Sequence, residues 1–471
     1  MATAVAGPDD PDVPGGPDDP DVPGGPGQPD VRGGQGVAAD AGLLRFAAVG
    51  SVDDGKSTLI GRLLHDTKQL FDDQIQALSS ASRRRGVDGV DLSFVTDGLR
   101  AEREQGITID VAYRYAATPR RKFVIADCPG HVQYTRNMAT GASTADLAVV
   151  VVDVTGGLRE QTRRHCCIAT LLGVRSWIVA ANKMDLAGWG QSAFDAVAGD
   201  VAELARRLGA SPPLVVPVSA LDGDNVVEPS DRAPWYQGPT VLQALQDAPS
   251  GTWAAGTGNG ARLPVQWVLR RPGGGRDYAG MVSGGVLRPG DEVVVLPGGG
   301  RTVVAAVSTF DGPLDAAVPP MSVTVTLADD LDVSRGDLIA PVAGAPEPRE
   351  EVEATICWFA EAPLAAGQRY QVKHTTRVAP VRVVSVRSRL DVGSMTLTEA
   401  PELRTNDIGV ARLHSAVPLA ADAYPANRVT GSFVLIDEAT HATVAAGLVG
   451  LPPVTAGTGS PAAAPVGELR P

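Results

Sequence analysis

The sequence lacks any long hydrophobic run. No stretch of about 18 consecutive apolar residues occurs in its 471 residues, so we expect no membrane-spanning helix and no membrane partner. The N-terminus also lacks the basic and apolar segments of a secretory signal. Only four cysteines are present, two of them adjacent, and such a pattern does not make a disulfide framework. These absences together predict a cytoplasmic protein.

An excess of basic residues is also missing. The 41 lysines and arginines are outnumbered by 54 aspartates and glutamates, which gives a formal charge of −13. A protein that binds nucleic acid without sequence specificity needs a basic face, so this balance argues against a nucleic-acid partner. The hydrophobic content of 44% is ordinary for globular proteins, and the length is enough for several domains, each with its own core.

Both ends of the chain have a composition that does not favour folding. A nonapeptide, Gly-Pro-Asp-Asp-Pro-Asp-Val-Pro-Gly, occupies residues 7–15 and recurs at 16–24. Proline, glycine and aspartate at this density bury too little apolar surface to offset the entropy of ordering, so residues 1–40 are predicted to be a disordered acidic leader. Residues 456–471 are rich in alanine, glycine and proline and are predicted to be a disordered tail.

Residues 41–250 alternate apolar runs with helical patterns, which is typical of an α/β domain with a parallel-type sheet and crossover helices. The predicted strands are Leu43–Val49, Lys122–Ala126, Leu147–Val152, Trp177–Ala181 and Leu214–Val218. The predicted helices are Ser57–His65, Glu160–Leu172 and a stripe of apolar residues from Phe194 to Leu208.

The pattern changes after a Gly-rich linker at 250–261. Residues 262–345 and 350–455 consist of short β-type runs separated by Pro-Gly and Gly-Gly turns. Two small antiparallel β-barrels fit this pattern better than one long sandwich.

A phosphate-binding motif follows the first predicted strand. The stretch Gly-Ser-Val-Asp-Asp-Gly-Lys-Ser-Thr fits the pattern G-x-x-x-x-G-K-[ST] of the P-loop, whose backbone N–H groups surround phosphate at a helix N-terminus. Lys56 is expected to reach the β- and γ-phosphates, and the Ser57 hydroxyl to bind Mg²⁺. The predicted phosphate-binding residues are Gly50, Ser51, Val52, Asp53, Asp54, Gly55, Lys56, Ser57 and Thr58.

A second stretch, Asp127-Cys128-Pro129-Gly130-His131, follows the next predicted strand. Asp127 is expected to bind Mg²⁺ through water, and the Gly130 N–H to bond the γ-phosphate. Thr108, in the polar loop before it, is predicted to close on Mg²⁺ when the γ-phosphate is present. His131 then lies where it could orient the attacking water, so we expect catalysis to involve His131, Lys56 and Thr108.

Two further stretches predict how a guanine base is recognised. Asp185, in Asn182-Lys183-Met184-Asp185, can accept hydrogen bonds from guanine N1–H and the exocyclic amine, a pair that adenine does not offer. Asn182 is expected to support the base and its loop, and the Lys183 stem to cover the ring face. In Ser219-Ala220-Leu221 the Ala220 N–H could meet guanine O6. The cofactors predicted from all these motifs are GTP and Mg²⁺.

One run of residues resembles a metal site but is interpreted as structural. His165-Cys166-Cys167 holds three residue types that bind metals, but neighbours on a helix diverge by about 100° each and cannot easily share one ion.

These motifs resemble those of the translational-factor GTPases. Within that superfamily the chain looks like the large, GTP-binding subunit of bacterial sulfate adenylyltransferase. The narrower resemblance rests on Asp54, where elongation factors generally carry histidine, and on four longer stretches: Leu63–Gln69, Asp97–Arg114, Gln133–Ser143 and Gly431–Thr440. It covers roughly residues 43–450.

The resemblance implies a division of labour between two subunits. A separate small ATP-pyrophosphatase-like subunit would join ATP and sulfate into adenosine 5′-phosphosulfate and pyrophosphate, in a heterodimer or a higher assembly. This chain would hydrolyse GTP to drive that unfavourable reaction in sulfate assimilation. No second phosphate loop follows the barrels, so adenylylsulfate kinase activity is not expected.

Two other functions stay open at this point. An elongation-factor-like translational GTPase would need basic surfaces that face tRNA, and the charge of −13 weighs against it. A stand-alone regulatory GTPase would hydrolyse GTP at a rate that ATP and sulfate do not change.

Overall fold

The computed structural model of the chain describes residues 42–70, 92, 108–249, 260–271 and 274–452. The predicted leader, the predicted tail, most of the linker at 250–261 and all of the stretch 97–107 lie outside the described residues. Within the described ranges, no helix is long and apolar enough to cross a membrane.

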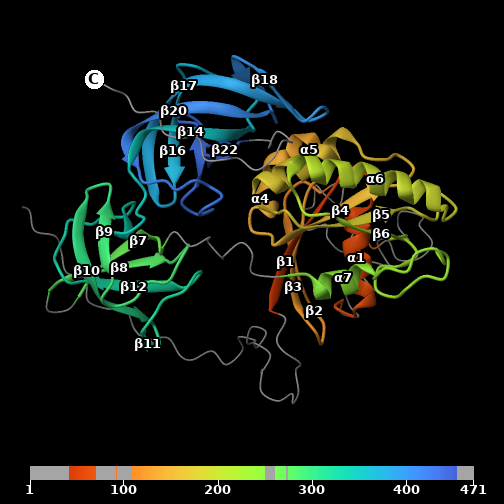
Figure 1. Cartoon of the computed structure of the whole chain (residues 1–471), viewed down its shortest axis with the longest axis horizontal. Coiled ribbons are helices and arrows are strands. Elements are labelled where there is room, and N and C mark those ends of the chain that lie inside the picture. Colours follow the sequence, from red (N-terminus) through yellow and green to blue (C-terminus); the bar gives the residue numbers. More distant parts are fainter. Residues whose placement is uncertain (1–41, 71–91, 93–107, 250–259, 272–273, 453–471) are drawn as a thin grey trace, which may run out of the picture. The chain divides into compact units, whose positions relative to one another are not determined.

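The first part of the chain forms a six-stranded sheet with the order β2-β3-β1-β4-β5-β6 (Figure 1). Its strands are β1 (Leu43–Val49), β2 (Ala112–Ala117), β3 (Lys122–Asp127), β4 (Leu147–Asp153), β5 (Trp177–Asn182) and β6 (Leu214–Pro217). Five of them pair in parallel, whereas β2 runs antiparallel to β3 at the edge. The predicted α/β class is confirmed, and the sheet is mixed because of this one edge strand.

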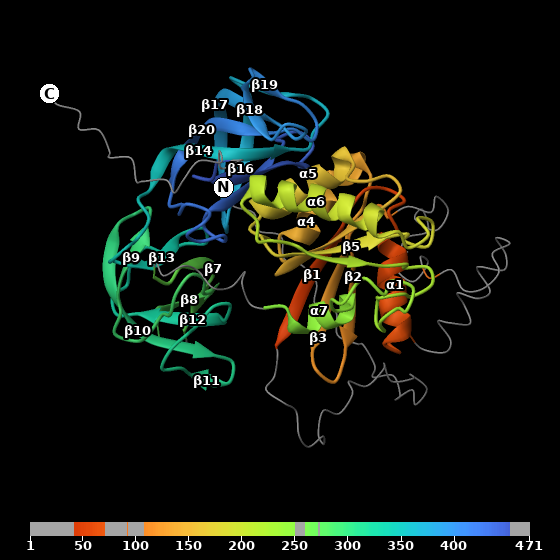
Figure 2. The same cartoon turned by 45° about the vertical axis from the view of Figure 1, so that its right-hand side comes forward.

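Helices cover both faces of the sheet (Figure 2). They are α1 (Lys56–Asp66), α4 (Thr135–Ala142), α5 (Glu160–Leu171), α6 (Gln191–Leu208) and α7 (Val241–Asp247), with a 3₁₀ turn, η2 (Val132–Tyr134). Apolar residues of α1 and α7 pack in one core cluster, and those of α4, α5 and α6 pack in the other. Gly209 ends α6 in the left-handed conformation, as expected for a residue that terminates a helix.

Strand β4 shows why the sheet needs two apolar faces. All seven of its residues are buried. Val149 and Val151 belong to the core cluster beside α1 and α7, whereas Val150 and Val152 belong to the cluster on the opposite face. Because successive side chains of a strand point to opposite faces, a strand covered on both sides reads as a continuous apolar run.

The order of the strands indicates where in the sheet a ligand would bind. β1 lies between β3 and β4, so the chain turns in opposite directions from this central strand. In open α/β sheets, ligands bind outside the carboxyl ends of the strands at such a switch point. The three motif-bearing loops predicted from the sequence follow β1, β3 and β5, and the β6 loop carries the fourth.

The chain then forms a closed antiparallel barrel with the sheet order β11-β10-β12-β8-β7-β13-β9, which β9 closes by pairing with β10. Its strands are β7 (Leu263–Arg270), β8 (Arg276–Met281), β9 (Glu292–Leu296), β10 (Gly300–Thr309), β11 (Gly312–Pro313), β12 (Ser322–Leu327) and β13 (Leu338–Pro341). In β12 the residues Val323, Val325 and Leu327 are buried and alternate with more exposed ones, as a strand with one core face requires.

A second closed antiparallel barrel follows, with the order β16-β21-β22-β14-β20-β17-β18 and a closing pair between β16 and β17. Its strands are β14 (Arg349–Trp358), β16 (Arg369–His374), β17 (Arg377–Asp391), β18 (Thr396–Glu399), β20 (Ile408–Leu419), β21 (Ser432–Ile436) and β22 (Thr443–Val449). The short strands β15 (Leu364–Ala365) and β19 (Glu402–Leu403) pair separately.

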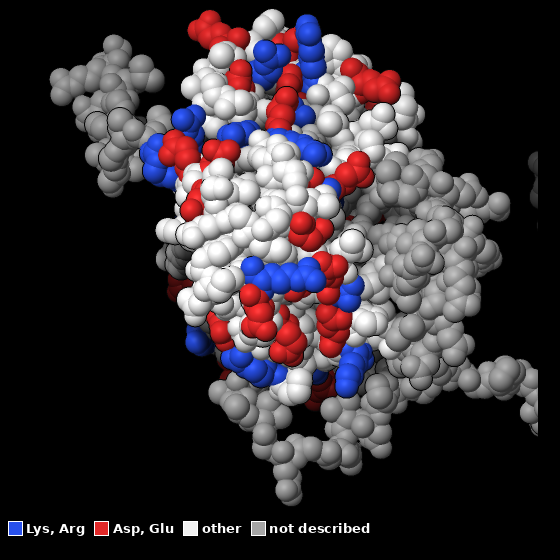
Figure 3. Space-filling view, turned by 90° about the vertical axis from the view of Figure 1, so that its right-hand side faces the viewer, with Lys and Arg blue, Asp and Glu red and all other residues white. Residues whose placement is uncertain are grey.

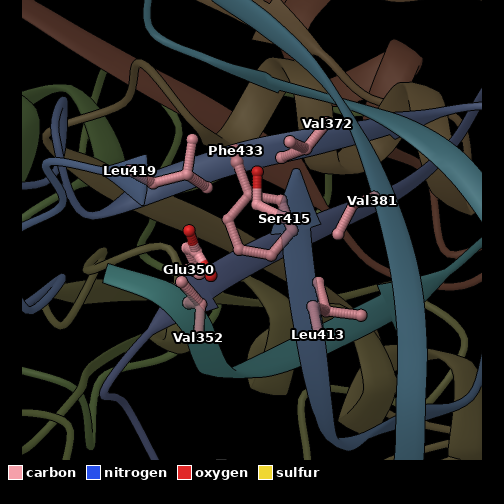
Figure 4. Close-up of a pocket in the computed structure, with 8 residues that line it drawn as sticks. All are labelled: Glu350, Val352, Val372, Val381, Leu413, Ser415, Leu419 and Phe433. Atoms are coloured by element: carbon pink, nitrogen blue, oxygen red, sulfur yellow. The ribbon is translucent and has the colours of Figure 1, made fainter. Parts of the chain in front are cut away.

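Side chains fill the interior of the second barrel (Figure 4). The cavity drawn there has a volume of about 10 Å³ and is lined by Glu350, Val352, Val372, Val381, Leu413, Ser415, Leu419 and Phe433. That volume is about one water-sized sphere, so this interior is a packed core rather than a ligand cavity.

Candidate functional site

Two glycines let the loop between β1 and α1 curl against its neighbours. Gly50 has φ 151° and Gly55 has φ 95°, values that favour glycine. A Cβ on Gly50 would lie 2.4 Å from the Val151 carbonyl oxygen, and one on Gly55 would lie 2.3 Å from the Asn182 amide nitrogen. Any other residue at either position would therefore push the loop off the strands that support it.

Lys56 is held inside the site. Its side chain is buried, and its Nζ donates a hydrogen bond to the Ser51 carbonyl oxygen over 2.7 Å. Burial lowers the pKa of Lys56, and the charge of Asp127 opposes that shift. A Cβ on Gly130 would lie 2.5 Å from this ammonium and 2.9 Å from the Val52 nitrogen. The phosphate loop and the Asp-Cys-Pro-Gly stretch thus lie next to each other.

Three oxygen-bearing side chains meet at the N-terminus of α1. The Ser57 hydroxyl donates to Asp127 Oδ2 over 3.1 Å and lies 3.3 Å from the Thr108 hydroxyl. Asp127 is fully buried at the end of β3. Two hydroxyls and a carboxylate are hard oxygen ligands of the kind that Mg²⁺ prefers, so the residues present fit this ion.

His131 and Cys128 have different surroundings although they are neighbours in one motif. His131 is half-buried, has extended backbone angles and precedes η2, and its ring packs edge-on against Tyr134 with centroids 6.3 Å apart. The Cys128 thiol is fully buried, and a Cβ on Gly141 would come within 2.6 Å of its sulfur. Burial raises the pKa of Cys128, so the thiol stays protonated and occupies space in the core.

Within the His165-Cys166-Cys167 run, His165 contacts the phosphate loop, whereas both cysteines are buried in the core. The Gly50 N–H donates to His165 Nδ1 over 3.4 Å, and Gln161 Nε2 lies 2.7 Å from His165 Nε2. Burial lowers the pKa of His165 to about 3, so the ring is neutral. Burial also raises the pKa of Cys166 to about 12. No group of three His, Cys, Asp or Glu side chains suited to a metal ion occurs within the described ranges.

Asn182 joins the predicted guanine loop to the phosphate loop. Its Nδ2 donates to the Asp54 carbonyl oxygen over 2.8 Å, and its Oδ1 accepts from the Ala220 N–H over 3.0 Å. The Ala220 N–H is therefore engaged by Asn182 here, and its contact with guanine O6 stays a prediction. Asp185 is half-buried, whereas Leu221 is 68% exposed.

Sequence reasoning missed two charged residues of this site. Asp153 ends β4, at the same sheet edge as Asp127 and Asn182, and its Oδ2 accepts a hydrogen bond from Lys183 Nζ over 2.8 Å. The position of Asp153 after an apolar strand was the available signal. Arg159 directly precedes α5 and donates to the Val52 carbonyl oxygen over 3.1 Å, and no local sequence pattern marks it.

Comparison with known proteins places this geometry in a family. Residues 42–250 match the family described as the elongation factor Tu GTP binding domain, and residues 351–450 match the GTP-eEF1A C-terminal domain-like family. The bifunctional enzyme CysN/CysC of Mycobacterium tuberculosis (strain ATCC 25618 / H37Rv) is 52% identical over 427 residues, which are 89% of this chain and 69% of that protein. Sulfate adenylyltransferase subunit 1 of Aeromonas salmonicida (strain A449) is 49% identical over 409 residues, 86% of each chain. The chain belongs to the sulfate adenylyltransferase subunit 1 family.

Membership in this family confirms the resemblance given by the motifs. The relatives are named sulfate adenylyltransferase subunit 1, and this chain carries the GTP-binding domain that the family model describes. The interpretation as a translational GTPase is correspondingly weaker. The name "subunit 1" indicates that these relatives work with another subunit.

Proposed function

We propose that this chain binds and hydrolyses GTP as the GTPase subunit of a sulfate adenylyltransferase. The observation that carries the proposal is the meeting of Ser57, Thr108 and Asp127 beside the buried Lys56. The loops that follow β1, β3, β5 and β6 carry four of the predicted motifs, and Thr108, in the segment before β2, approaches Ser57 from the fifth.

At the phosphate end, each side chain has a separate task. Lys56 would leave the Ser51 carbonyl and bind the β- and γ-phosphates. Ser57 and Thr108 would hold Mg²⁺ directly and Asp127 through water, and the bound ion would neutralise charge on the phosphates. The Gly130 N–H would bond the γ-phosphate, and His131 would orient the attacking water.

At the base end, the Asp185 carboxylate would select guanine. Two hydrogen bonds from N1–H and the exocyclic amine fit its two oxygens, and adenine lacks this pair of donors. The Lys183 stem would cover the ring, with its ammonium fixed by Asp153. Asn182 would hold this loop at a fixed distance from the phosphates through its bonds to the Asp54 carbonyl oxygen and the Ala220 N–H.

The partner in this proposal is a small ATP-pyrophosphatase-like subunit. On it, a sulfate oxygen would attack the α-phosphorus of ATP, which yields adenosine 5′-phosphosulfate and releases pyrophosphate. The mixed anhydride is high in energy, so the reaction needs a second source of free energy. The loops around Thr108 and His131 would supply the coupling by ordering when the γ-phosphate is bound and releasing when it is lost.

The division of labour along the chain is part of the same proposal. Residues 41–250 would form the GTPase domain, 262–345 and 350–455 the two barrel domains, and 1–40 and 456–471 the leader and tail. The chain would work in the cytoplasm. A translational role would require a basic surface for tRNA, whereas the face drawn in Figure 3 carries acidic and basic side chains intermingled.

Recovery of the full chain with its natural partners tests the proposal. A tagged chain, purified from its own organism in the presence of GTP and Mg²⁺, should carry a small ATP-pyrophosphatase-like protein in a fixed ratio. The purified complex should form adenosine 5′-phosphosulfate from ATP and sulfate. Recovery of tRNA in a fixed ratio, without such a protein, would instead support delivery of tRNA.

A further inference from the structure

The phosphate loop contains a charge that works against phosphate binding. Asp54 is fully buried in the loop, and its Oδ2 accepts hydrogen bonds from the Ser51 N–H over 2.9 Å and from the Thr162 hydroxyl over 3.5 Å. Its Oδ1 accepts no hydrogen bond from any residue that the structure describes. A buried carboxylate with one unsatisfied oxygen is costly by itself, and more so beside an anionic ligand.

The guanidinium of Arg159 faces Asp54 Oδ1. Arg159 Nη1 lies 3.6 Å from Asp54 Oδ1, and the same nitrogen donates to the Val52 carbonyl oxygen over 3.1 Å. Within the described ranges, Arg159 is the only cation within 4.0 Å of the Asp54 carboxylate. A Cβ on Gly156 would lie 2.9 Å from Arg159 Nη2, so the small residue there leaves room for the guanidinium.

The Arg159 guanidinium also lies near the ion pair between Asp153 and Lys183 at the guanine end. Arg159 Nη2 lies 4.0 Å from Asp153 Oδ2, the oxygen that accepts the hydrogen bond from Lys183. Burial raises the pKa of Asp153, but bonds from Lys183 and Thr155 outweigh it and leave that pKa lowered. Asp153 is thus an ionised carboxylate with Lys183 as its close partner, so the Arg159 guanidinium is available to Asp54, whose ionised form the charge of Lys56 also favours.

We propose that Arg159 is a positioning residue of the nucleotide site: its guanidinium neutralises Asp54, so that the phosphate loop can accept a polyphosphate. The inference rests on the proposed binding of GTP at this loop. Without the guanidinium, the Asp54 charge would repel the phosphates and the Val52–Asp54 segment would lose a tether. The repulsion would grow with the charge of the nucleotide and would therefore affect GTP more than GDP.

The charged groups around Asp54 define the expected pH dependence. Lys56 in the loop and Arg159 at the start of α5 favour its ionised form, whereas Asp153 at the end of β4 and burial oppose it, and the net result is a raised pKa. Removal of Arg159 raises that pKa further because a favourable charge is lost. Protonation of Asp54 would then restore phosphate binding, so the defect should shrink as the pH falls.

The experiment measures the affinity of the full chain for GTP and GDP, with Mg²⁺, by titration of a fluorescent nucleotide from pH 6 to pH 8. Arg159→Gln should weaken GTP binding about tenfold at pH 8 and GDP binding less, with a smaller defect at pH 6. Arg159→Lys, which keeps the charge, should recover part of the loss. Asp54→Asn combined with Arg159→Gln should bind GTP within about twofold of Asp54→Asn alone.

A matched control removes an arginine of similar exposure elsewhere. Arg120 pairs with Asp247 at 2.6 Å, with both side chains more than half exposed, and Arg120→Gln changes the net charge by the same amount. It should leave GTP affinity unchanged. A parent chain that does not bind GTP would refute the proposed function itself. A parent chain that binds GTP, with an Arg159→Gln defect that is absent, independent of pH or not relieved by Asp54→Asn, would overturn the role of Arg159.

Discussion

At the phosphate end of the site Lys56 is 7% exposed and Asp127 is fully buried, whereas at the guanine end Asp185 is half-buried and Leu221 is 68% exposed. The phosphate end is held by contacts among its own parts, such as the bond between Lys56 and the Ser51 carbonyl. The guanine end relies on one amide, Asn182, that joins two loops.

The two ends of the site should therefore respond differently to substitution. Buried charges that stabilise one another cannot be removed singly without leaving a partner uncompensated, so substitutions at the phosphate end should abolish binding or turnover. A partly exposed carboxylate on a loop braced by its neighbours can change its ligand without disturbing the fold. Substitutions at the guanine end should therefore alter specificity.

The largest effect is expected from Lys56→Ala. Loss of this ammonium removes the ligand for the β- and γ-phosphates and the positive charge that interacts with Asp127, which should weaken GTP binding about a thousandfold, or ~4 kcal/mol. Isothermal titration with GTP and Mg²⁺ measures it. The exposed Lys122→Ala provides the control, and GTP affinity within twofold of the parent chain in Lys56→Ala would refute this role.

His131→Ala should separate turnover from binding at the same end. Because His131 is expected to act on the attacking water alone, kcat for GTP should fall about a hundredfold while the dissociation constant stays unchanged. Single-turnover hydrolysis alongside equilibrium binding gives both values. His65→Ala, on α1, is a histidine control, and a normal rate in His131→Ala would show that another group orients the water.

Asp185→Asn tests the guanine end. An asparagine side chain offers a donor in place of one carboxylate oxygen, so it matches the carbonyl of xanthine better than the exocyclic amine of guanine. Preference for GTP over xanthosine triphosphate should change by about a hundredfold, with the fold intact. Asp195→Asn, on the exposed face of α6, keeps the same change in charge. Unaltered GTP affinity in Asp185→Asn would exclude the contact.

A smaller effect concerns stability in acid. His165 stays neutral in the folded chain because burial lowers its pKa to about 3, whereas the unfolded chain binds a proton near pH 6.5. Folding stability from this group is therefore present above pH 6.5 and is lost as the pH falls, by roughly 1.4 kcal/mol between pH 7.5 and 5.5. Urea unfolding at both pH values should show this loss, and His165→Gln should reduce it.

A surface histidine supplies the comparison for that measurement. His441 is exposed and has a left-handed backbone, φ 58°, which asparagine tolerates. His441→Asn should keep the full loss of stability on acidification. An equal loss in His165→Gln would mean that other groups cause it.

Much of the α/β part was predictable because apolar runs and terminal polar residues mark its strands. Leu43–Val49 was predicted with the observed bounds, and the motifs after β1, β3 and β5 lie at the predicted edge. Strand β2 escaped prediction because it is an edge strand whose tyrosines, Tyr113 and Tyr115, are exposed. Helix α4 was missed because it has only 8 residues, and Met138 is the one large apolar side chain among those it buries.

The site residues that belong to sequence motifs could be predicted. The residues whose positions depend on how the chain packs could not. Lys56 and Asp127 belong to patterns whose spacing follows from phosphate and Mg²⁺ chemistry. Arg159 is placed by the path of the loop between β4 and α5, which brings it to Asp54 from 105 positions away in the sequence. Such a contact depends on the tertiary fold, and no local sequence pattern predicts it.

Hydrolysis of GTP by the purified chain is the measurement to make, alone and with its co-purifying small subunit, with ATP and sulfate added or withheld. A GTPase that drives sulfate activation should be slow alone and should accelerate only when the small subunit, ATP and sulfate are all present, with adenosine 5′-phosphosulfate formed in step. Turnover that is indifferent to the partner and to its substrates would contradict the coupling.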